Sequence, residues 1–174
     1  MKGKLAEAEA RLIIRQVIMG LQALKQKGVL HRDLKLANVM LHFSEFRNDP
    51  SDSKKLCEYI KNFEFETKHN TMTCKIADLG FARQVDEGAK AGTSCGTPLY
   101  MAPEVMFGKE YSHESDVWSM GCLFYSMLFA APPFPAHSLN ELRQALCQGI
   151  FKVPADKNLS VAGMNFLQQM LMFD

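Results

Sequence analysis

The chain has 174 residues, 47% of them apolar, and its 20 Lys and Arg residues nearly balance its 19 Asp and Glu residues. This length suits one compact domain, and the apolar content is high enough for a core, which argues against global disorder. The net charge of +1 gives no reason to expect nucleic acid or a membrane surface as a partner.

The five cysteines are scattered and odd in number, and none forms a Cys-x-x-Cys pair, which is typical of reduced thiols in a cytosolic protein. Charged residues interrupt the N-terminal stretch, so no signal peptide is expected. The longest apolar stretch, 117–131, contains two serines and is shorter than the roughly 20 residues that cross a bilayer. We therefore expect a cytoplasmic protein without a membrane span, and a buried core helix over 117–131.

Apolar residues recur at helical spacing over 12–24, which predicts a helix. Two glutamates favour its first turns, and two lysines followed by Gly28 favour its end. The apolar positions occupy more than half of the circumference, so this helix should be buried on several sides. Short strands are predicted at 29–30, 39–41 and 74–77, with a polar loop between the first two.

Residues 43–73 are first polar and charged and then mixed with aromatic residues, without a sustained period. We interpret them as a surface insertion with a short helix near 54–62. A solvated loop is the expected form of the remainder, and a partner-binding site is the alternative. Residues 86–96 are rich in Gly, Ala, Ser and Thr, the composition of a mobile segment.

The C-terminal part is predicted to be helical. Three prolines after 117–131 force a loop, and Ser138 with Glu141 then forms a capping box that opens a helix ending at Gly149. Ser160 is placed to cap a last helix. Helices dominate, so the predicted fold class is mainly α with small β pieces.

Four short strings stand out: HRDLKLAN at 31–38, DLG at 78–80, GTPLYMAPE at 96–104 and DVWSMG at 116–121. Each string alone would be an ordinary loop, turn or helix start. Their order and spacing together exclude coincidence.

On these four strings the chain resembles the eukaryotic protein kinases, from its first helix almost to its end. The resemblance implies a protein-kinase-like large, C-terminal lobe over 1–174, incomplete at both ends, with 78–104 as its activation segment. It also implies transfer of the γ-phosphate of Mg·ATP to protein Ser or Thr hydroxyls. ATP and Mg²⁺ are the implied cofactors, and proteins that carry Ser or Thr are the implied substrates.

The resemblance also implies roles for the residues of the first two strings. Asp33 would accept the proton of the substrate hydroxyl and orient it, and Lys35 would offset negative charge on the transferring phosphate. Asn38 and Asp78 would supply hard oxygen ligands to Mg²⁺. Met40 would form part of the floor under adenine.

Four further residues would support this chemistry. His31 is expected to be structural and not a base, packed with Leu79 and anchored by Asp116. Leu79 stands where the family usually has Phe, and it is expected to fill much of the same packing position. Gly80 would let the backbone swing after the preceding metal ligand without a side-chain clash.

Arg32 carries a regulatory implication. In the family, an Arg before the catalytic Asp usually pairs with a phosphorylated residue of the activation segment. Thr93 is the first candidate acceptor and Ser94 the second, modified by an upstream kinase or by autophosphorylation. The alternative is that both are ordinary loop hydroxyls.

Hydroxyl specificity is also implied by the resemblance. Lys35 within the first string, and Thr97 followed by Pro98 in the third, are similar to the serine/threonine branch of the family. Thr97 would hydrogen-bond toward Asp33 and Lys35 and hold the loop in register. The strings at 74–83 and 93–104 further resemble those of the autophagy-initiating kinases.

The chain also departs from the family pattern. It contains no Gly-x-Gly-x-x-Gly loop and no Val-Ala-Ile-Lys strand, and the Arg that usually pairs with Glu104 is absent. We therefore expect a part of a longer kinase, in which Glu104 lacks its usual buried ion pair and these residues alone bind ATP poorly. The alternative function is a non-catalytic kinase lobe that acts as a binding or scaffold module.

Overall fold

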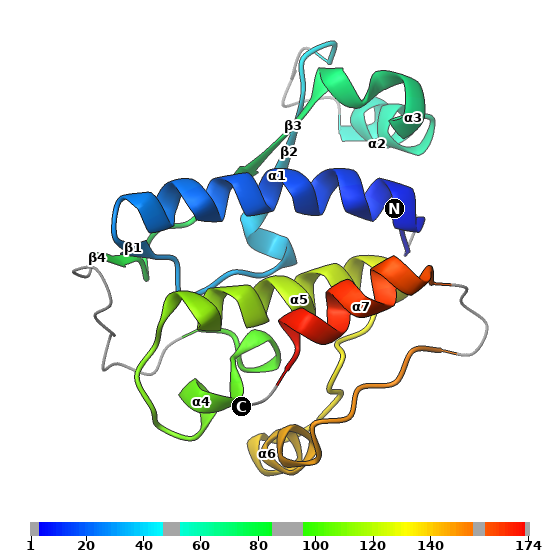
Figure 1. Cartoon of the computed structure of the whole chain (residues 1–174). Helices are drawn as coiled ribbons and strands as arrows, with labels where there is room; N and C mark the ends of the chain where they lie inside the picture. The colour runs from blue at the N-terminus through cyan, green and yellow to red at the C-terminus, as the bar shows by residue number, and fades with distance from the viewer. Residues whose placement is uncertain (1–3, 47–52, 85–95, 155–158, 173–174) are drawn as a thin grey trace.

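The fold is built mainly from helices (Figure 1). The computed structural model describes residues 4–46, 53–84, 96–154 and 159–172. The α-helices are α1 (Glu7–Gln26), α2 (Ser53–Lys61), α3 (Phe65–Lys68), α4 (Pro103–Met106), α5 (His113–Phe129), α6 (Leu139–Gln148) and α7 (Val161–Met170). The 3₁₀ turns are η1 (Leu36–Asn38), η2 (His69–Thr71) and η3 (Pro98–Tyr100). The predicted helical class is confirmed.

Four short strands form two antiparallel pairs. β1 (Val29–Leu30) pairs with β4 (Arg83–Gln84), and β2 (Val39–Phe43) pairs with β3 (Met72–Ile76). The 31–38 loop joins β1 to β2, so both ends of this loop are held by strands. The strand at 29–30 appears as predicted, the one predicted at 39–41 extends to Phe43, and the one predicted at 74–77 runs from Met72 to Ile76.

Helices α1 and α5 form the centre of the core, lying side by side in Figure 1 with α7 against α5. α5 is apolar around its whole circumference, and nearly all of its residues are buried, as expected for a central helix. At Gly121 a side chain would come within 2.9 Å of Met170 and Leu171, so this glycine allows α7 to approach α5 closely. Within the described residues, none of the helices combines the length and apolar character that a membrane crossing needs.

The predicted helix ends are confirmed by their hydrogen bonds. Gly28 and Gly149 adopt left-handed conformations, with φ of 64° each; Gly28 follows the C-cap residue of α1, and Gly149 is the C-cap residue of α6. The hydroxyl of Ser138 accepts a bond from the backbone N–H of Glu141, and that of Ser160 accepts one from Gly163. The four described cysteines, Cys57, Cys74, Cys122 and Cys147, are free thiols, as predicted.

The aromatic residues of the 43–73 segment are packed against one another, unlike those of a solvated loop. The predicted short helix is present as α2, and Phe43 and Phe63 are 4% and 7% exposed. Their rings lie 4.9 Å apart edge to face, and Tyr59 and Phe65 pack against them. Aromatic pairs of this geometry stabilise beyond their buried area. The segment therefore has a small aromatic core, which continues into the main core at β2.

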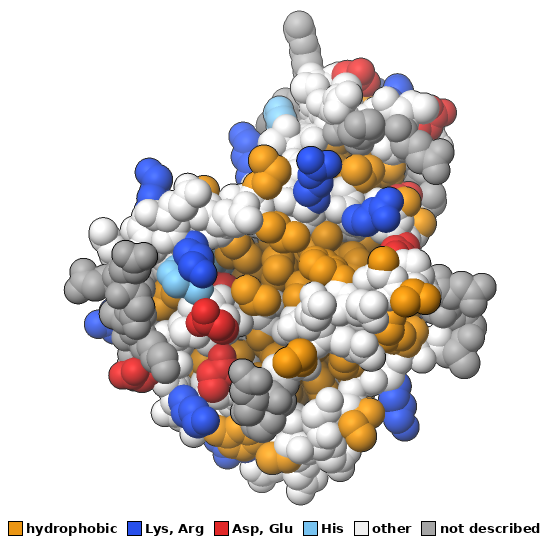
Figure 2. All heavy atoms as spheres, viewed as in Figure 1, with side chains coloured by type: hydrophobic (Ala, Val, Ile, Leu, Met, Phe, Trp, Pro, Cys, Tyr) orange, Lys and Arg blue, Asp and Glu red, His pale blue; other side chains and the backbone are white. Residues whose placement is uncertain are grey.

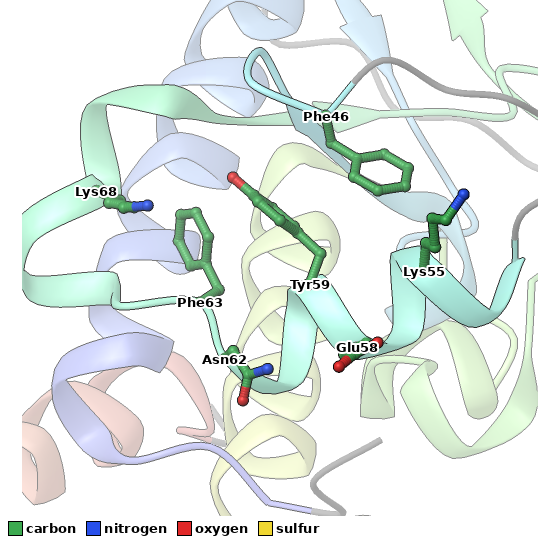
Figure 3. A pocket seen from close by; sticks show the side chains of 7 residues that line it. All are labelled: Phe46, Lys55, Glu58, Tyr59, Asn62, Phe63 and Lys68. Atoms are coloured by element: carbon green, nitrogen blue, oxygen red, sulfur yellow. The ribbon is translucent and has the colours of Figure 1, made fainter.

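A pocket of about 390 Å³ opens beside this aromatic core (Figure 3). Tyr59 and Phe63 of the core line it together with charged residues of α2 and α3. It is lined by Phe46, Lys55, Glu58, Tyr59, Asn62, Phe63 and Lys68. None of the residues of the 31–38 loop belongs to it.

The aromatic core predicts a large effect of Phe63→Ala. Because the ring is buried among three others, its removal should lower the free energy of unfolding by about 3–5 kcal/mol. Ile150→Ala, at a side chain that is 72% exposed, should change it by no more than about 0.5 kcal/mol. Urea denaturation of both variants measures the difference, and equal stabilities would show that the segment is not packed.

Candidate catalytic site

The backbone of the 31–38 loop is anchored by one buried carboxylate. Asp116 of α5 accepts the N–H of His31 at Oδ2 (3.0 Å) and the N–H of Arg32 at Oδ1 (3.1 Å). Tyr111 donates its hydroxyl to the same Oδ1 at 2.7 Å. Arg32 has φ of 73°, a conformation that costs a non-glycine residue about 1–3 kcal/mol. These three bonds hold the loop in its strained form.

His31 joins this loop to the strand that follows the 43–73 segment. Its ring is fully buried, with Nδ1 accepting the N–H of Asp33 at 3.3 Å and Nε2 lying 3.1 Å from the carbonyl of Ala77. Both contacts are hydrogen bonds only when the proton is on Nε2. The residue thus bridges two segments of the site. Leu79, which was expected to pack with it, is 54% exposed and does not fill a buried position.

Three side chains converge on Asp33, whose own side chain is 3% exposed. Lys35 donates to Oδ2 at 2.6 Å, and Asn38 donates to Oδ2 at 3.2 Å and to the Asp33 carbonyl at 2.7 Å. Thr97 donates to Oδ1 at 2.9 Å and accepts from Lys35 at 3.0 Å. The network therefore contains the contacts predicted for Thr97.

Gly96 brings Thr97 into this network. It has φ of 111°, and a Cβ there would lie 2.7 Å from the carbonyl oxygen of Arg32. Only glycine combines this conformation with so close an approach of two backbones. The GTPLYMAPE string therefore touches the loop through its first residue and bonds to Asp33 through its second.

The environment of Asp33 lowers its pKa. Burial alone raises the pKa of this carboxyl, but hydrogen bonds from Lys35 and Thr97, the charge of Lys35 and the bond from Asn38 together outweigh burial. The pKa lies below the ordinary value of 3.8, so Asp33 is ionised at neutral pH. A permanently charged carboxylate suits the orientation of a hydroxyl group.

Asn38 and Asp78 lie at the same end of the β2–β3 pair. The N–H of Ala77 donates to the carbonyl of Asn38 at 2.8 Å, and Asp78 follows directly. Asp78 has φ of 62° and accepts the N–H of Gly80 at 3.2 Å. The left-handed residue of this turn is therefore Asp78, and the predicted backbone swing does not begin at Gly80.

The donors present fit one divalent ion of the magnesium type. An amide oxygen from Asn38 and a carboxylate from Asp78 are hard ligands, and Mg²⁺ typically takes one or two protein ligands and completes its shell with phosphates and water. Among the described residues there is no cluster of three His, Cys, Asp or Glu side chains that would hold a metal alone. The two residues would therefore bind the ion together with a phosphate ligand.

Met40 and Glu104 complete the predicted set. Met40 is 55% exposed on β2, and alternation along the strand places it on the face opposite Val39 and Leu41. Glu104 is partly buried and accepts the hydroxyl of Ser115 at 2.5 Å. Glu104 is expected to lack its usual ion pair, and in the structure it receives the hydrogen bond from Ser115 of α5 instead.

Arg32 is the second residue of the loop, and its side chain is buried. It is 7% exposed, and its guanidinium carbon lies 6.0 Å from the centre of the Tyr111 ring, a cation–π distance. The two candidate phosphorylation sites, Thr93 and Ser94, lie outside the described residues. The pairing predicted for Arg32 stays a prediction.

An apolar groove of about 500 Å³ lies behind the loop. Val39 and Leu41 contribute to it from β2, Phe63 from the aromatic core, and Leu5 and Met127 from the opposite side. Figure 2 shows apolar side chains gathered in the hollow at the centre of this face. Its apolar lining offers few groups for a phosphate, so the polar chemistry remains with Asp33.

Three features of this site were not predicted. Tyr111 precedes Asp116 by five residues, a spacing across a helix start that gives no signal by itself. In the sequence, Gly96 is simply the first residue of the third string, and nothing there indicates its close approach to Arg32. The anchoring of the loop through the backbone N–H groups of His31 and Arg32 has no side-chain signature.

The structure thus brings the four sequence strings together around the 31–38 loop, through Asp116, Ala77 and Thr97. The sequence matches the protein kinase domain over residues 1–174, and the chain therefore belongs to the protein kinase family.

Three curated relatives that it matches are serine/threonine kinases. The chain is 34% identical over 166 residues to the serine/threonine-protein kinase PLK1 of Xenopus tropicalis, which covers 95% of this chain and 23% of that protein. The same kinase of Xenopus laevis is 34% identical over 169 residues, 97% of this chain and 23% of that protein. Serine/threonine-protein kinase 33 of Mus musculus is 32% identical over 178 residues, 99% of this chain and 33% of that protein. The chain thus spans about a quarter to a third of the length of these relatives.

The lowered pKa of Asp33 predicts a pH-dependent contribution to stability. Because the carboxyl binds its proton more weakly in the folded than in the unfolded state, its contribution is present above the ordinary pKa of 3.8 and is lost as the pH falls through the folded pKa. The difference in unfolding free energy between wild type and Asp33→Asn should therefore be constant near neutral pH and shrink below about pH 4.

Urea denaturation across this pH range measures the difference. Lys35→Met removes a hydrogen bond and the charge that lower the pKa, so in this background the loss should be smaller and should be complete at a higher pH. If the difference in unfolding free energy between wild type and Asp33→Asn grew on acidification, the lowered pKa of Asp33 would be contradicted.

Proposed function

We propose that this chain carries the catalytic loop of a serine/threonine protein kinase, which transfers the γ-phosphate of Mg·ATP to Ser or Thr hydroxyls of protein substrates. The observation that carries the proposal is the network around Asp33, in which Lys35, Asn38 and Thr97 all bond to one buried carboxylate. Membership in the protein kinase family supports it. The chain then corresponds to the large lobe of the domain.

Asp33 would position the substrate hydroxyl. Its low pKa makes it a weak base, so it holds the hydroxyl by accepting a hydrogen bond and takes the proton when the oxygen has become acidic through bond formation. Thr97 and Lys35 fix the two carboxylate oxygens and leave lone pairs for the substrate. Phosphoryl transfer depends mainly on this kind of positioning.

Lys35 and the two candidate metal ligands would act on the phosphate side. Lys35 is 26% exposed at the open edge of the network, where its charge would offset that of the transferring group. Asn38 and Asp78 would hold Mg²⁺ from two adjacent strand ends. When bound, the ion neutralises phosphate charge. Met40 would meet the adenine ring with its exposed apolar side chain.

Regulation, location and subfamily are proposals of the same kind. Arg32 adjoins Asp33 in sequence, so a phosphate on Thr93 or Ser94 that paired with it would couple the activation segment to the loop. An upstream kinase or the protein itself would supply that phosphate. A cytoplasmic location and the resemblance to autophagy-initiating kinases remain predictions from the sequence.

Asp33→Asn tests the proposed function. In the protein as expressed from its natural gene, the variant should lower kcat for transfer from radiolabelled Mg·ATP to a Ser/Thr peptide mixture by about 10²–10⁴-fold, because it removes the charged group that positions the hydroxyl. Glu110→Gln, at an exposed carboxylate, serves as the matched control and should leave kcat unchanged.

Two outcomes would contradict the proposal. Label that appears on tyrosine and not on Ser or Thr would reject the substrate class. A wild-type protein that transfers no phosphate yet captures protein partners would favour the binding or scaffold module.

A further inference from the structure

The outer edge of β3 points away from its partner strand. The N–H of Ala77 points to β2, where it bonds to Asn38. Because backbone groups alternate along an antiparallel strand, those of residues 72, 74 and 76 point to the other side. A two-stranded pair leaves this edge without a third strand, so its backbone groups need partners from elsewhere.

Gln16 of α1 supplies those partners. Its side-chain Oε1 accepts the N–H of Cys74 at 2.8 Å, and its Nε2 donates to the carbonyl of Met72 at 3.4 Å. One side-chain amide thus makes the donor and acceptor contacts that a neighbouring strand would make. Among the described residues of α1, Gln16 makes the hydrogen bonds to the backbone of β3. In the sequence it lies between Ile14 and Val17, which are both buried.

Gly20, one turn further along α1, leaves room for the Ile76 side chain between the helix and the strand. A Cβ at this position would lie 2.8 Å from Cδ1 and 3.3 Å from Cγ1 of Ile76. A glycine inside a helix is unfavourable unless something approaches closely, and here the Ile76 side chain does so. Gln16 and Gly20 are four residues apart, so they share the face of α1 that meets β3.

This contact bears on the site because β3 leads directly to Asp78. The loop is anchored to α5 through Asp116 and bonds to Ala77 through Asn38 and His31, whereas the other edge of β3 is held by α1 through Gln16. The separation between the hydroxyl-positioning Asp33 and the metal ligand Asp78 therefore depends on both contacts of this strand, the one with the loop and the one with α1. Small displacements of such supporting contacts are costly to metal binding and to catalysis.

We propose that Gln16 and Gly20 are positioning residues for the metal–nucleotide complex: α1 closes the free edge of β3 and thereby sets the place of Asp78. This inference rests on the proposed kinase function. It assigns neither residue a contact with substrate or metal.

Gln16→Met tests the amide directly, because methionine keeps the length of the side chain and lacks both hydrogen-bonding groups. In the protein as expressed from its natural gene, hydrogen exchange at the Cys74 amide should become about tenfold faster. The concentration of Mg²⁺ that gives half-maximal phosphate transfer should rise about tenfold, and kcat at saturating Mg²⁺ should change less. Gln22→Met, at an exposed glutamine of the same helix, should change neither quantity.

Gly20→Ala tests the spacing by a second route. The added methyl group should push against Ile76 and raise the Mg²⁺ requirement in the same way. Ile76→Val removes Cδ1, the atom of the shorter contact, so the double variant Gly20→Ala with Ile76→Val should recover most of the wild-type Mg²⁺ dependence.

The outcomes separate this inference from the function on which it rests. An active wild-type protein in which Gln16→Met leaves the Mg²⁺ dependence or the Cys74 exchange unchanged would overturn the inference alone. A fall in kcat at unchanged Mg²⁺ dependence would also overturn it, because it would show a merely structural role. A wild-type protein without phosphate transfer would overturn the proposed function and, with it, the inference.

Discussion

The site depends on one buried carboxylate, that of Asp116. It accepts two backbone N–H groups from the catalytic loop and the hydroxyl of Tyr111, so three donors satisfy a charge that is 3% exposed. An unpaired buried carboxylate would be costly, and so would the left-handed backbone at Arg32 without a partner for its N–H. The bond between the two groups removes both costs, because the Arg32 N–H gains an acceptor and the Asp116 carboxylate gains a donor. Because α5 is the central helix, the loop is bonded to an element that is itself held by packing in the core.

The contacts around Asp33 are built on this anchored loop. His31 links the loop to Ala77, Gly96 lets a distant segment approach, and Thr97 then reaches Asp33. The result is an ionised carboxylate with fixed oxygens and a lysine at its open edge. Such a group is a poor base and a good orienting group, which suits a reaction in which positioning and charge compensation supply most of the rate.

Much of the fold and of the site was predictable because it has side-chain signatures. Periodicity predicted α1, capping residues predicted the starts of α6 and α7, and the resemblance to the protein kinases grouped Asp33, Asn38 and Asp78. Other features have no such signature. A left-handed Arg32 and bonds to backbone N–H groups are tertiary effects. The aromatic core of 43–73 has no regular period because its rings come from a strand, two helices and a loop. Burial could not be read from residue type either, since Leu79 is apolar and exposed.

Asp116 holds the 31–38 loop in its observed conformation through two backbone bonds. Amide hydrogen exchange at His31 and Arg32, measured by NMR in wild type and in Asp116→Asn, tests it most directly. The account predicts that both amides exchange at least about tenfold faster in the variant, equivalent to about 1.4 kcal/mol, while amides in the middle of α1 keep their protection. Unchanged protection of both loop amides would contradict it.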